Sequence, residues 1–341
     1  MAQATSPNIG EAYYQLSPEI LESFPKFRPP VDLYALDENI AVLSIFSRKG
    51  NRLTNEQVQK AAELCAQGDL FVCRSDQHIY IHHMVKQLDL ILQDENLTEA
   101  ECSEICLRAL TMRYAEYHEQ PVPELLDKLY RDVMVFTEYL WQDQYRINTF
   151  FRRLFRKQTP AKHAINSMVT GLWLRRQIPP EQERKDFDRT AAALILHDVG
   201  MCKVPPFILS KKTALKQDEK EKVLQHPITS VKLMRKSDLV FNELIRACFE
   251  HHERLDGSGY PQKLSGSQIS PMGRLAAVAD SFSAMICDRP YAKGKAPIEA
   301  AKELAEDPRY DATLTGILKM GFASGKIGNP IDADKLVEDE K

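Results

Sequence analysis

Apolar and polar positions alternate in short runs through the first quarter of the chain, a pattern that predicts β-strands. Runs rich in β-branched and aromatic residues stand at residues 31–54, 69–74 and 78–83. The polar segment ahead of these runs is expected to be mobile. Residues 55–68 instead follow the helical period and close at Gly68, a favoured residue just beyond a helix end. The pattern predicts a small α/β module over residues 1–90.

Beyond this module, hydrophobic residues recur every three to four positions, which is the period of an α-helix. Residues 91–150 predict two or more long amphipathic helices that form a linker. Residues from 160 to about 325 predict helices joined by short loops. The fold class is therefore expected to be α+β, with an all-α helical bundle over residues 151–341 joined by the helical linker to the small module.

Composition narrows the class of protein without naming a partner. With 341 residues, 43% of them hydrophobic, the chain is long enough to bury a sizeable core. Its 45 basic and 48 acidic residues are interspersed, which argues against a surface for a nucleic acid polymer. No apolar run approaches the roughly 20 residues of a membrane span, and the start lacks the pattern of a signal peptide. The cytoplasm is the expected location.

Two groups of potential metal ligands are expected to be structural. Seven cysteines without a CxxC pair fit a reducing compartment, and Cys102 and Cys106, one helical turn apart, are expected to be core thiols. His78, His82 and His83 lie on a predicted strand, where His83 would point away from the other two. These three are expected to be surface or half-buried histidines.

Two aspartates raise a different problem, because each ends or interrupts an apolar helix. Asp198 follows the apolar stretch 189–196, for which Gly200 is the expected C-terminal cap, and Asp280 lies within the apolar stretch 274–286. Burying a carboxylate that has no partner costs several kcal/mol of folding free energy. These positions therefore predict a shared cation.

The histidines of the C-terminal half stand in settings that suit such a cation. His163 lies on a small, polar face of its predicted helix, and His226 precedes a proline at a helix junction. The adjacent His251 and His252 close another helix, about 100° apart around its axis. Imidazole and carboxylate groups are the usual donors for zinc, manganese and iron, and two ions can share a bridging aspartate. The candidate ligands of a two-metal centre are His163, His197, Asp198, His226, His251, His252 and Asp280.

Ordered motifs around these residues resemble a known family. The motifs are His163, HDVG at 197–200, HP at 226–227, HHERLDGSGYP at 251–261 and DSFSAMICDRPY at 280–291. They resemble the HD-GYP family of bacterial cyclic di-GMP phosphodiesterases, a branch of the HD-domain metal-dependent phosphohydrolases. The resemblance covers roughly residues 150–325.

The resemblance implies an HD-type helical bundle and a set of roles. The seven candidate ligands match the family's metal ligands, with Asp198 at the bridging position between two divalent ions such as iron or manganese. Catalysis is expected to involve Asp198, His226 and Lys203, while Gly259 and Tyr260 lie beside the substrate and Arg289 grips phosphate. The implied reaction is attack on phosphorus by water that the ions acidify, giving pGpG from cyclic di-GMP and GMP from pGpG.

Departures from the family pattern keep alternatives open. Thr159 stands where the family often has a glutamate that supports a third ion, so two ions are expected. Met201 replaces a usual lysine, and Lys203 is the nearest substitute. The alternatives are a weakly active domain that binds nucleotide or a protein partner, and a phosphohydrolase that acts on another nucleotide. The N-terminal module is expected to regulate or dimerise, with a homodimer forming through it or through the linker helices.

Overall fold

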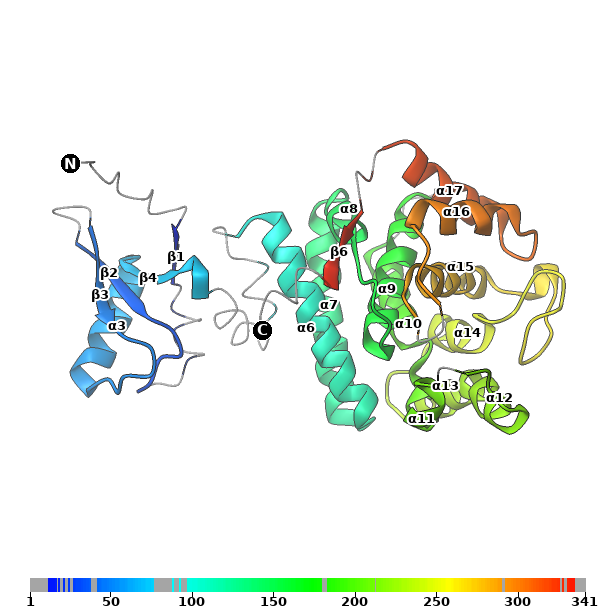
Figure 1. Ribbon diagram of the computed structural model, residues 1–341, viewed down its shortest axis with the longest axis horizontal. Coiled ribbons are helices and arrows are strands. Elements are labelled where there is room, and N and C mark those ends of the chain that lie inside the picture. Colours follow the sequence, from blue (N-terminus) through cyan, green and yellow to red (C-terminus); the bar gives the residue numbers. More distant parts are fainter. Residues whose placement is uncertain are drawn as a thin grey trace. The chain divides into compact units, whose positions relative to one another are not determined.

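The computed structural model divides the chain into two compact units, Met1–Cys106 and Leu107–Asp339 (Figure 1). It describes residues 12–16, 18, 21, 24, 27–37, 42–76, 88, 92, 97–179, 183–211, 213–289, 292–325, 327 and 330–334. The predicted strand histidines at 78, 82 and 83 lie outside the described residues. The predicted three-part division at residues 90 and 150 stays a prediction.

The described part of the first unit contains an antiparallel sheet and helix α3, which agrees with the predicted α/β module. The strand order is β1-β4-β2-β3, with bounds Tyr13–Gln15, Leu70–Cys73, Leu33–Asp37 and Val42–Ser47. Helix α3 (Asn55–Gln67) begins with a capping box on Thr54 and ends where Gly68 adopts φ 84°. The segment expected to be mobile includes strand β1. Its residues Tyr13–Gln15 pair with β4 in antiparallel register, so this part of the segment forms regular structure.

Helix α6 (Glu99–Glu119) starts in the first unit with a partly buried polar network. Glu101 accepts hydrogen bonds from the Tyr14 hydroxyl at 2.6 Å and from Arg74 Nη1 at 2.9 Å. The guanidinium of Arg74 also lies 4.0 Å from the centroid of the Tyr14 ring. Cys102 and Cys106 are buried in the core, as expected.

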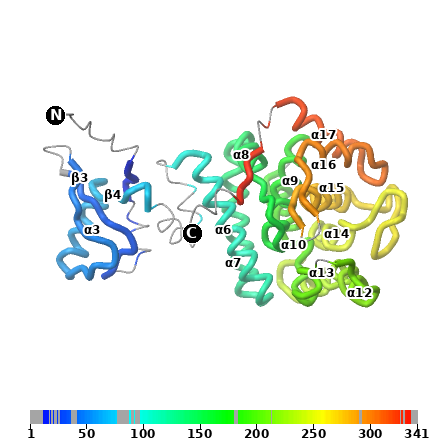
Figure 2. Tube along the Cα trace, viewed as in Figure 1, coloured from blue at the N-terminus to red at the C-terminus, as the bar shows by residue number. Residues whose placement is uncertain are grey.

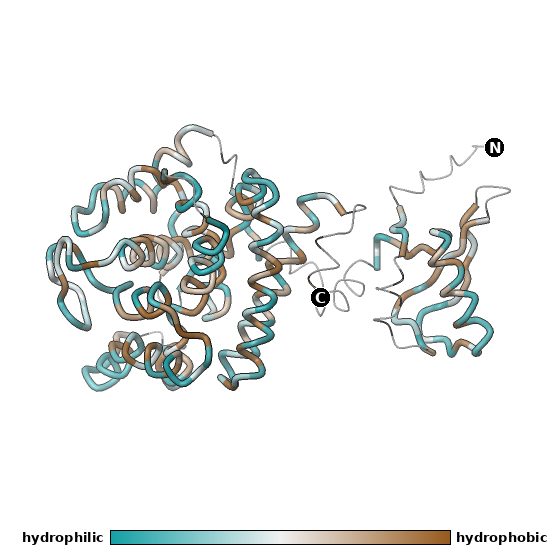
Figure 3. The backbone as a smooth tube through the Cα atoms, turned by 180° about the vertical axis from the view of Figure 1, so that it is seen from behind, coloured by the Kyte–Doolittle hydropathy of each residue, from teal (hydrophilic) through white to brown (hydrophobic). Residues whose placement is uncertain are grey.

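The second unit is a helical bundle, which confirms the predicted class. Its helices after α6 are α7 (Pro123–Gln142), α8 (Arg146–Phe151), α9 (Pro160–Arg176), α10 (Arg184–Leu196), α11 (Pro206–Leu209), α12 (Gln217–Leu224), α13 (His226–Met234), α14 (Asn242–Glu250), α15 (Pro271–Ile286), α16 (Pro297–Glu306) and α17 (Ala312–Ala323). Helix α9 packs against both α10 and α15. Brown, hydrophobic stretches alternate with teal, hydrophilic ones along the helices in Figure 3, the amphipathic pattern that the sequence shows.

Helix α9 is buried on nearly every side, which explains why its sequence is not amphipathic. Asn166, on the face of His163, exchanges two hydrogen bonds of 2.9 Å with the backbone of Phe155. The segment before α9 is thereby fixed, and with it the turn that leads to His163.

The C-terminal segment returns to the start of the bundle, where Figure 2 shows it in red beside α8. Strand β6 (Ile331–Asp332) pairs in parallel with β5 (Arg153–Leu154). The buried Asp334 carboxylate accepts a hydrogen bond from the Arg156 backbone at 2.6 Å and pairs with Lys162. This carboxylate therefore anchors the residue that precedes His163.

No helix among the described residues combines the length and the apolar character that crossing a bilayer requires.

Candidate metal centre

The first pair of predicted ligands lies at the end of α10. His197 is fully buried, and its Nδ1 lies 2.6 Å from the Leu194 carbonyl oxygen. A ring nitrogen facing a carbonyl carries the hydrogen, so the other nitrogen, Nε2, holds a lone pair. This Nε2 has no hydrogen-bond partner among the described residues, and neither has Oδ1 of the adjacent Asp198. Two buried electron-pair donors thus stand side by side.

Gly200 does not cap α10, so this prediction is wrong. His197 is the C-cap residue, and Gly200 lies within the 3₁₀ helix η2 (Val199–Lys203) without a positive φ. A Cβ atom at Gly200 would lie 2.2 Å from the His226 carbonyl oxygen and 2.6 Å from the Ser230 backbone nitrogen. Glycine is required because the backbone of η2 packs directly against the start of α13.

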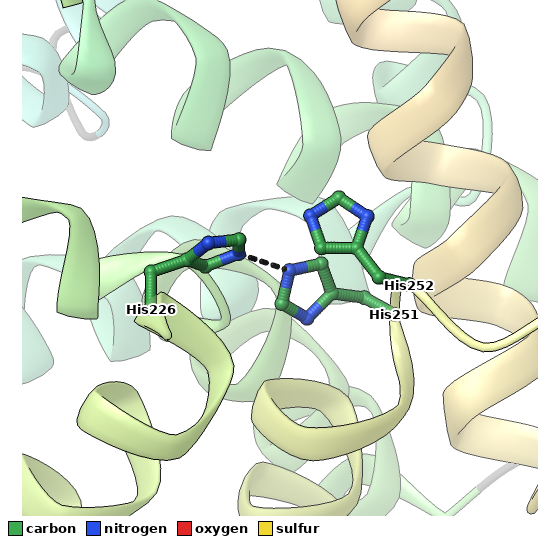
Figure 4. Close-up of side chains that lie close together, drawn as sticks. All are labelled: His226, His251 and His252. Carbon is green, nitrogen blue, oxygen red and sulfur yellow. Dashed lines mark hydrogen bonds between the residues drawn. The ribbon is translucent and has the colours of Figure 1, made fainter. Parts of the chain in front are cut away.

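The second group of ligands lies at the ends of α13 and α14 (Figure 4). Nδ1 of His226 lies 2.6 Å from the Val223 carbonyl oxygen, and Nδ1 of His251 lies 3.0 Å from that of Ala247. In neutral rings both Nε2 atoms therefore hold lone pairs, yet they lie only 3.0 Å apart. Two lone pairs repel at this distance unless a cation stands between them. With metal–nitrogen bonds of about 2.1 Å, neighbouring donors at a right angle lie about 3.0 Å apart.

His252 completes this second group. Its ring lies with those of His226 and His251 so that one nitrogen of each falls within 4.8 Å of the others. The Tyr260 ring stacks on His252 with a centroid distance of 4.6 Å and an angle of 23°. The tyrosine of the predicted GYP loop thus lies directly beside a predicted ligand.

Two carboxylates connect the histidines. Asp280 Oδ1 lies 2.9 Å from His163 Nε2 and 3.7 Å from His197 Nε2. Asp198 Oδ1 lies 3.1 Å from His226 Nε2, although Asp198 belongs with His163 and His197 in the other donor group. Asp198 is therefore positioned between the two groups, as a bridging ligand must be.

The buried groups of this centre shift one another's pKa values. Burial alone would raise the pKa of Asp280, but the hydrogen bond from His163 and the nearby His197 and His252 rings outweigh it and hold that pKa well below its usual value. Burial and the neighbouring imidazoles hold the pKa of His251 well below its usual value, and burial lowers the pKa of His252 to about 3. At His197 the opposing carboxylates, Asp280 foremost, outweigh burial and raise the pKa.

These residues can hold divalent ions, because several of their buried donor atoms lack a hydrogen-bond partner. The buried atoms without a hydrogen-bond partner in the described part of the chain include His163 Nδ1, His197 Nε2 and Asp198 Oδ1. Within that part, the ion pairs of Asp198 and Asp280 are formed with histidines and not with lysine or arginine. A set of five imidazoles around two carboxylates is a donor set for transition metals. The structure brings all seven predicted ligands together, while their role as ligands stays a prediction.

The other predicted substrate contacts lie in different local settings. Gly259 packs so closely that a Cβ atom would lie 2.5 Å from the His252 carbonyl oxygen. Arg289 lies in an irregular segment, where its backbone pairs with that of Ala292 at 2.8 and 3.2 Å. Lys203 is exposed at the end of η2 and forms no ion pair with the described residues. The expected phosphate contacts of Arg289 and Lys203 stay predictions.

Sequence reasoning missed two buried glutamates that shape the loop after α14. Glu253 accepts hydrogen bonds from the backbone nitrogens of Gln262 at 2.7 Å and Leu264 at 3.0 Å. Glu250 accepts hydrogen bonds from the backbone and the hydroxyl of Ser270 at 2.9 and 2.6 Å. Their position on either side of the paired histidines, at the end of an amphipathic helix, was the available signal.

The sequence that forms this site is similar to the sequences of known proteins. A family model described as HD domain matches residues 158–314. A cyclic di-GMP phosphodiesterase, PA4108 of Pseudomonas aeruginosa, is 39% identical over 146 residues, which cover 39% of this chain and 35% of that protein. The 3'3'-cGAMP-specific phosphodiesterase 3 of Vibrio cholerae is 32% identical over 168 residues, 49% of this chain and 36% of that protein. The aligned part therefore spans about a third of the length of these curated relatives.

A solved structure shares the fold. Bd1817, a HDG"Y"P protein from Bdellovibrio bacteriovorus, matches with a TM-score of 0.60 at 14% identity, over 91% of this chain and 99% of that chain. The helical fold and the HD motif, which the sequence predicts, are confirmed by these likenesses.

Proposed function

We propose that the protein is a metal-dependent phosphodiesterase of the HD-GYP branch, because residues 158–314 match the HD domain model and carry the motifs that resemble this branch. Its proposed substrate is cyclic di-GMP, which it hydrolyses to linear pGpG and onward to GMP. The observation that carries the proposal is the 3.0 Å approach of two Nε2 lone pairs, on His226 and His251, beside the carboxylate of Asp198.

The proposed centre holds two ions, iron or manganese, with Asp198 shared between them. One donor group is His163, His197 and Asp280, and the other is His226, His251 and His252. Divalent ions, when bound, would offset charge on phosphoryl oxygens and lower the pKa of a water molecule.

The chain's own contribution to the reaction is orientation. Backbone carbonyls fix Nδ1 of His197, His226 and His251, so the lone pairs of all three rings stay aimed at the same space. Tyr260 stacks on His252 and limits how far that ring turns. Substrate enters beside this tyrosine, and Arg289 and Lys203 are proposed to contact its phosphates, Lys203 after turning inward.

The remaining proposals concern the rest of the chain. We assign a regulatory or dimerising role to the module at residues 1–90, with the linker at 91–150 as a second candidate for a homodimer contact. The proposed location is the cytoplasm, where cyclic dinucleotides act as messengers.

The test is product analysis with the full chain. Protein loaded with Fe²⁺ or Mn²⁺ under reducing conditions is incubated with cyclic di-GMP, pGpG or 3'3'-cGAMP, and the products are separated by chromatography. We expect pGpG and then GMP, two bound ions by elemental analysis, and no turnover by Asp198→Asn. A metal-loaded protein that binds cyclic di-GMP without cleaving it would overturn the proposed activity and favour a binding module. Faster cleavage of 3'3'-cGAMP than of cyclic di-GMP would overturn the assignment of cyclic di-GMP as the substrate.

A further inference from the structure

Arg254, directly after the ligand helix, is held rigidly at the edge of the metal centre. Its Nη1 donates to the carbonyl oxygens of His251 at 3.1 Å and Glu253 at 2.8 Å, and its Nη2 donates to the Ser281 hydroxyl at 3.3 Å. The guanidinium carbon lies 4.6 Å from the centroid of the Tyr310 ring. One side chain thus connects the segment of His251 with the residue next to Asp280.

This anchoring leaves part of the guanidinium available. Three of its five N–H groups are used in the contacts above. The Nε hydrogen and one Nη2 hydrogen have no acceptor among the described residues. Nε is not one of the buried polar atoms that lack a partner, so its hydrogen faces space that solvent or a ligand can enter.

We infer that Arg254 binds a phosphodiester oxygen of the cyclic dinucleotide, an inference that rests on the proposed function. Each phosphodiester of such a substrate carries one negative charge, and a guanidinium offers two parallel N–H donors to phosphate oxygens. Because Arg254 is already fixed by Ser281 and Tyr310, little side-chain entropy remains to be lost on binding. Tyr310 also donates to Ser281 at 2.9 Å, so it fixes the residue that fixes Arg254.

The experiment compares steady-state kinetics of Arg254→Met, Arg254→Lys and the matched control Arg235→Met in the metal-loaded full chain. Arg235 is exposed and follows α13, so its variant removes the same charge away from the centre. Arg254→Met is expected to raise KM for cyclic di-GMP roughly tenfold to a hundredfold, the loss expected for a charge-assisted hydrogen bond, with a smaller fall in kcat. Arg254→Lys is expected to fall between wild type and Arg254→Met, and KM of Arg254→Met is expected to depend less on ionic strength.

The outcomes separate this inference from the proposed function. An inactive, fully loaded wild type contradicts the proposed function itself. If wild type is active and the KM of Arg254→Met lies within twofold of the wild-type KM, the role of Arg254 is contradicted while the proposed function stands. A loss of bound metal or of the helical circular dichroism in both Arg254 variants would show that Arg254 only holds the two segments together, which also overturns the inference.

Discussion

His226 and His251 face each other through their Nε2 atoms at 3.0 Å, while backbone carbonyls hold the opposite nitrogen of each ring. As long as both rings are neutral, neither can place a hydrogen between the two nitrogens without giving up its bond to the carbonyl. Folding thus brings like electron pairs together, at a cost that a bound cation removes.

Metal should therefore stabilise the fold. At free metal a hundred times above the dissociation constant, the gain is about 2.7 kcal/mol, which raises Tm by roughly 5–10 °C for a unit of this size. Differential scanning calorimetry with Mn²⁺ and with EDTA measures the difference. His226→Leu should show a smaller difference between the two buffers than wild type, because only the donors of the other ion remain complete. A wild type whose Tm does not respond to metal would contradict the cation between the rings.

Gly200→Ala tests the close approach of η2 to α13. The new Cβ would lie 2.2 Å from the His226 carbonyl oxygen, so the start of α13 and the His226 ring must move. We expect a loss of about 1–3 kcal/mol in the free energy of unfolding, typical of overpacking, together with weaker metal binding. Gly316→Ala is the matched control, because nothing lies within 4 Å of its new Cβ in α17, and it should be neutral or stabilising. Equal stability and metal affinity in both variants would refute the packing argument.

The metal-site residues could be predicted from the sequence because each interrupts a local pattern. Asp198 and Asp280 are carboxylates in apolar helices, and the paired histidines end another helix, so the anomaly is visible within a few residues. The role of Gly200 could not be read in this way. A glycine after a helix is compatible both with a cap and with close packing, and only the position of Ser230, thirty residues later, decides between them.

Long-range contacts explain the other gaps. Glu253 is a charged residue in a polar stretch, and its burial depends on backbone donors from the loop that follows it. Strand β1 is three residues long, and its pairing with β4 cannot be inferred from so short a run. Arg254 shows no local anomaly at all, since Ser281 and Tyr310 approach it only in the folded chain.

Glu253→Gln should loosen the loop that carries Tyr260. The carboxylate accepts two backbone hydrogen bonds, whereas the amide nitrogen of glutamine would face one of those donors. We expect a loss of about 1.5–3 kcal/mol in the free energy of unfolding and a higher KM for cyclic di-GMP, since hydrogen bonds to charged groups are of this size. Urea titration and steady-state kinetics measure the two effects.

The control for this variant is Glu303→Gln, which removes an exposed carboxylate paired with Lys295. An exposed ion pair contributes about 0–1 kcal/mol, so stability and KM should stay near wild type. Should Glu253→Gln match this control in both measurements, the loop would not depend on the buried carboxylate.

Glu101→Gln should change how the first unit responds to acid. Burial acts to raise the pKa of Glu101, but hydrogen bonds from Tyr14 and Thr98 and the charge of Arg74 outweigh it, so that pKa is lowered. A carboxylate with a lowered folded-state pKa contributes stability above its unfolded-state pKa of about 4.3, and the contribution is lost as pH falls through the folded-state value. The variant should therefore be less stable than wild type at pH 7 by about 1–2 kcal/mol, with the difference shrinking toward pH 3.

Hydrogen-exchange protection of peptides that cover β1 and β4 reports on this unit within the full chain. Glu99→Gln, exposed in the same first turn of α6, is the matched control and should cost only a few tenths of a kcal/mol. A protection difference between Glu101→Gln and wild type that stays constant from pH 7 to pH 3 would mean that the carboxylate is not ionised in the Tyr14 network. The lowered pKa requires the difference to vanish in acid, because both side chains are then uncharged.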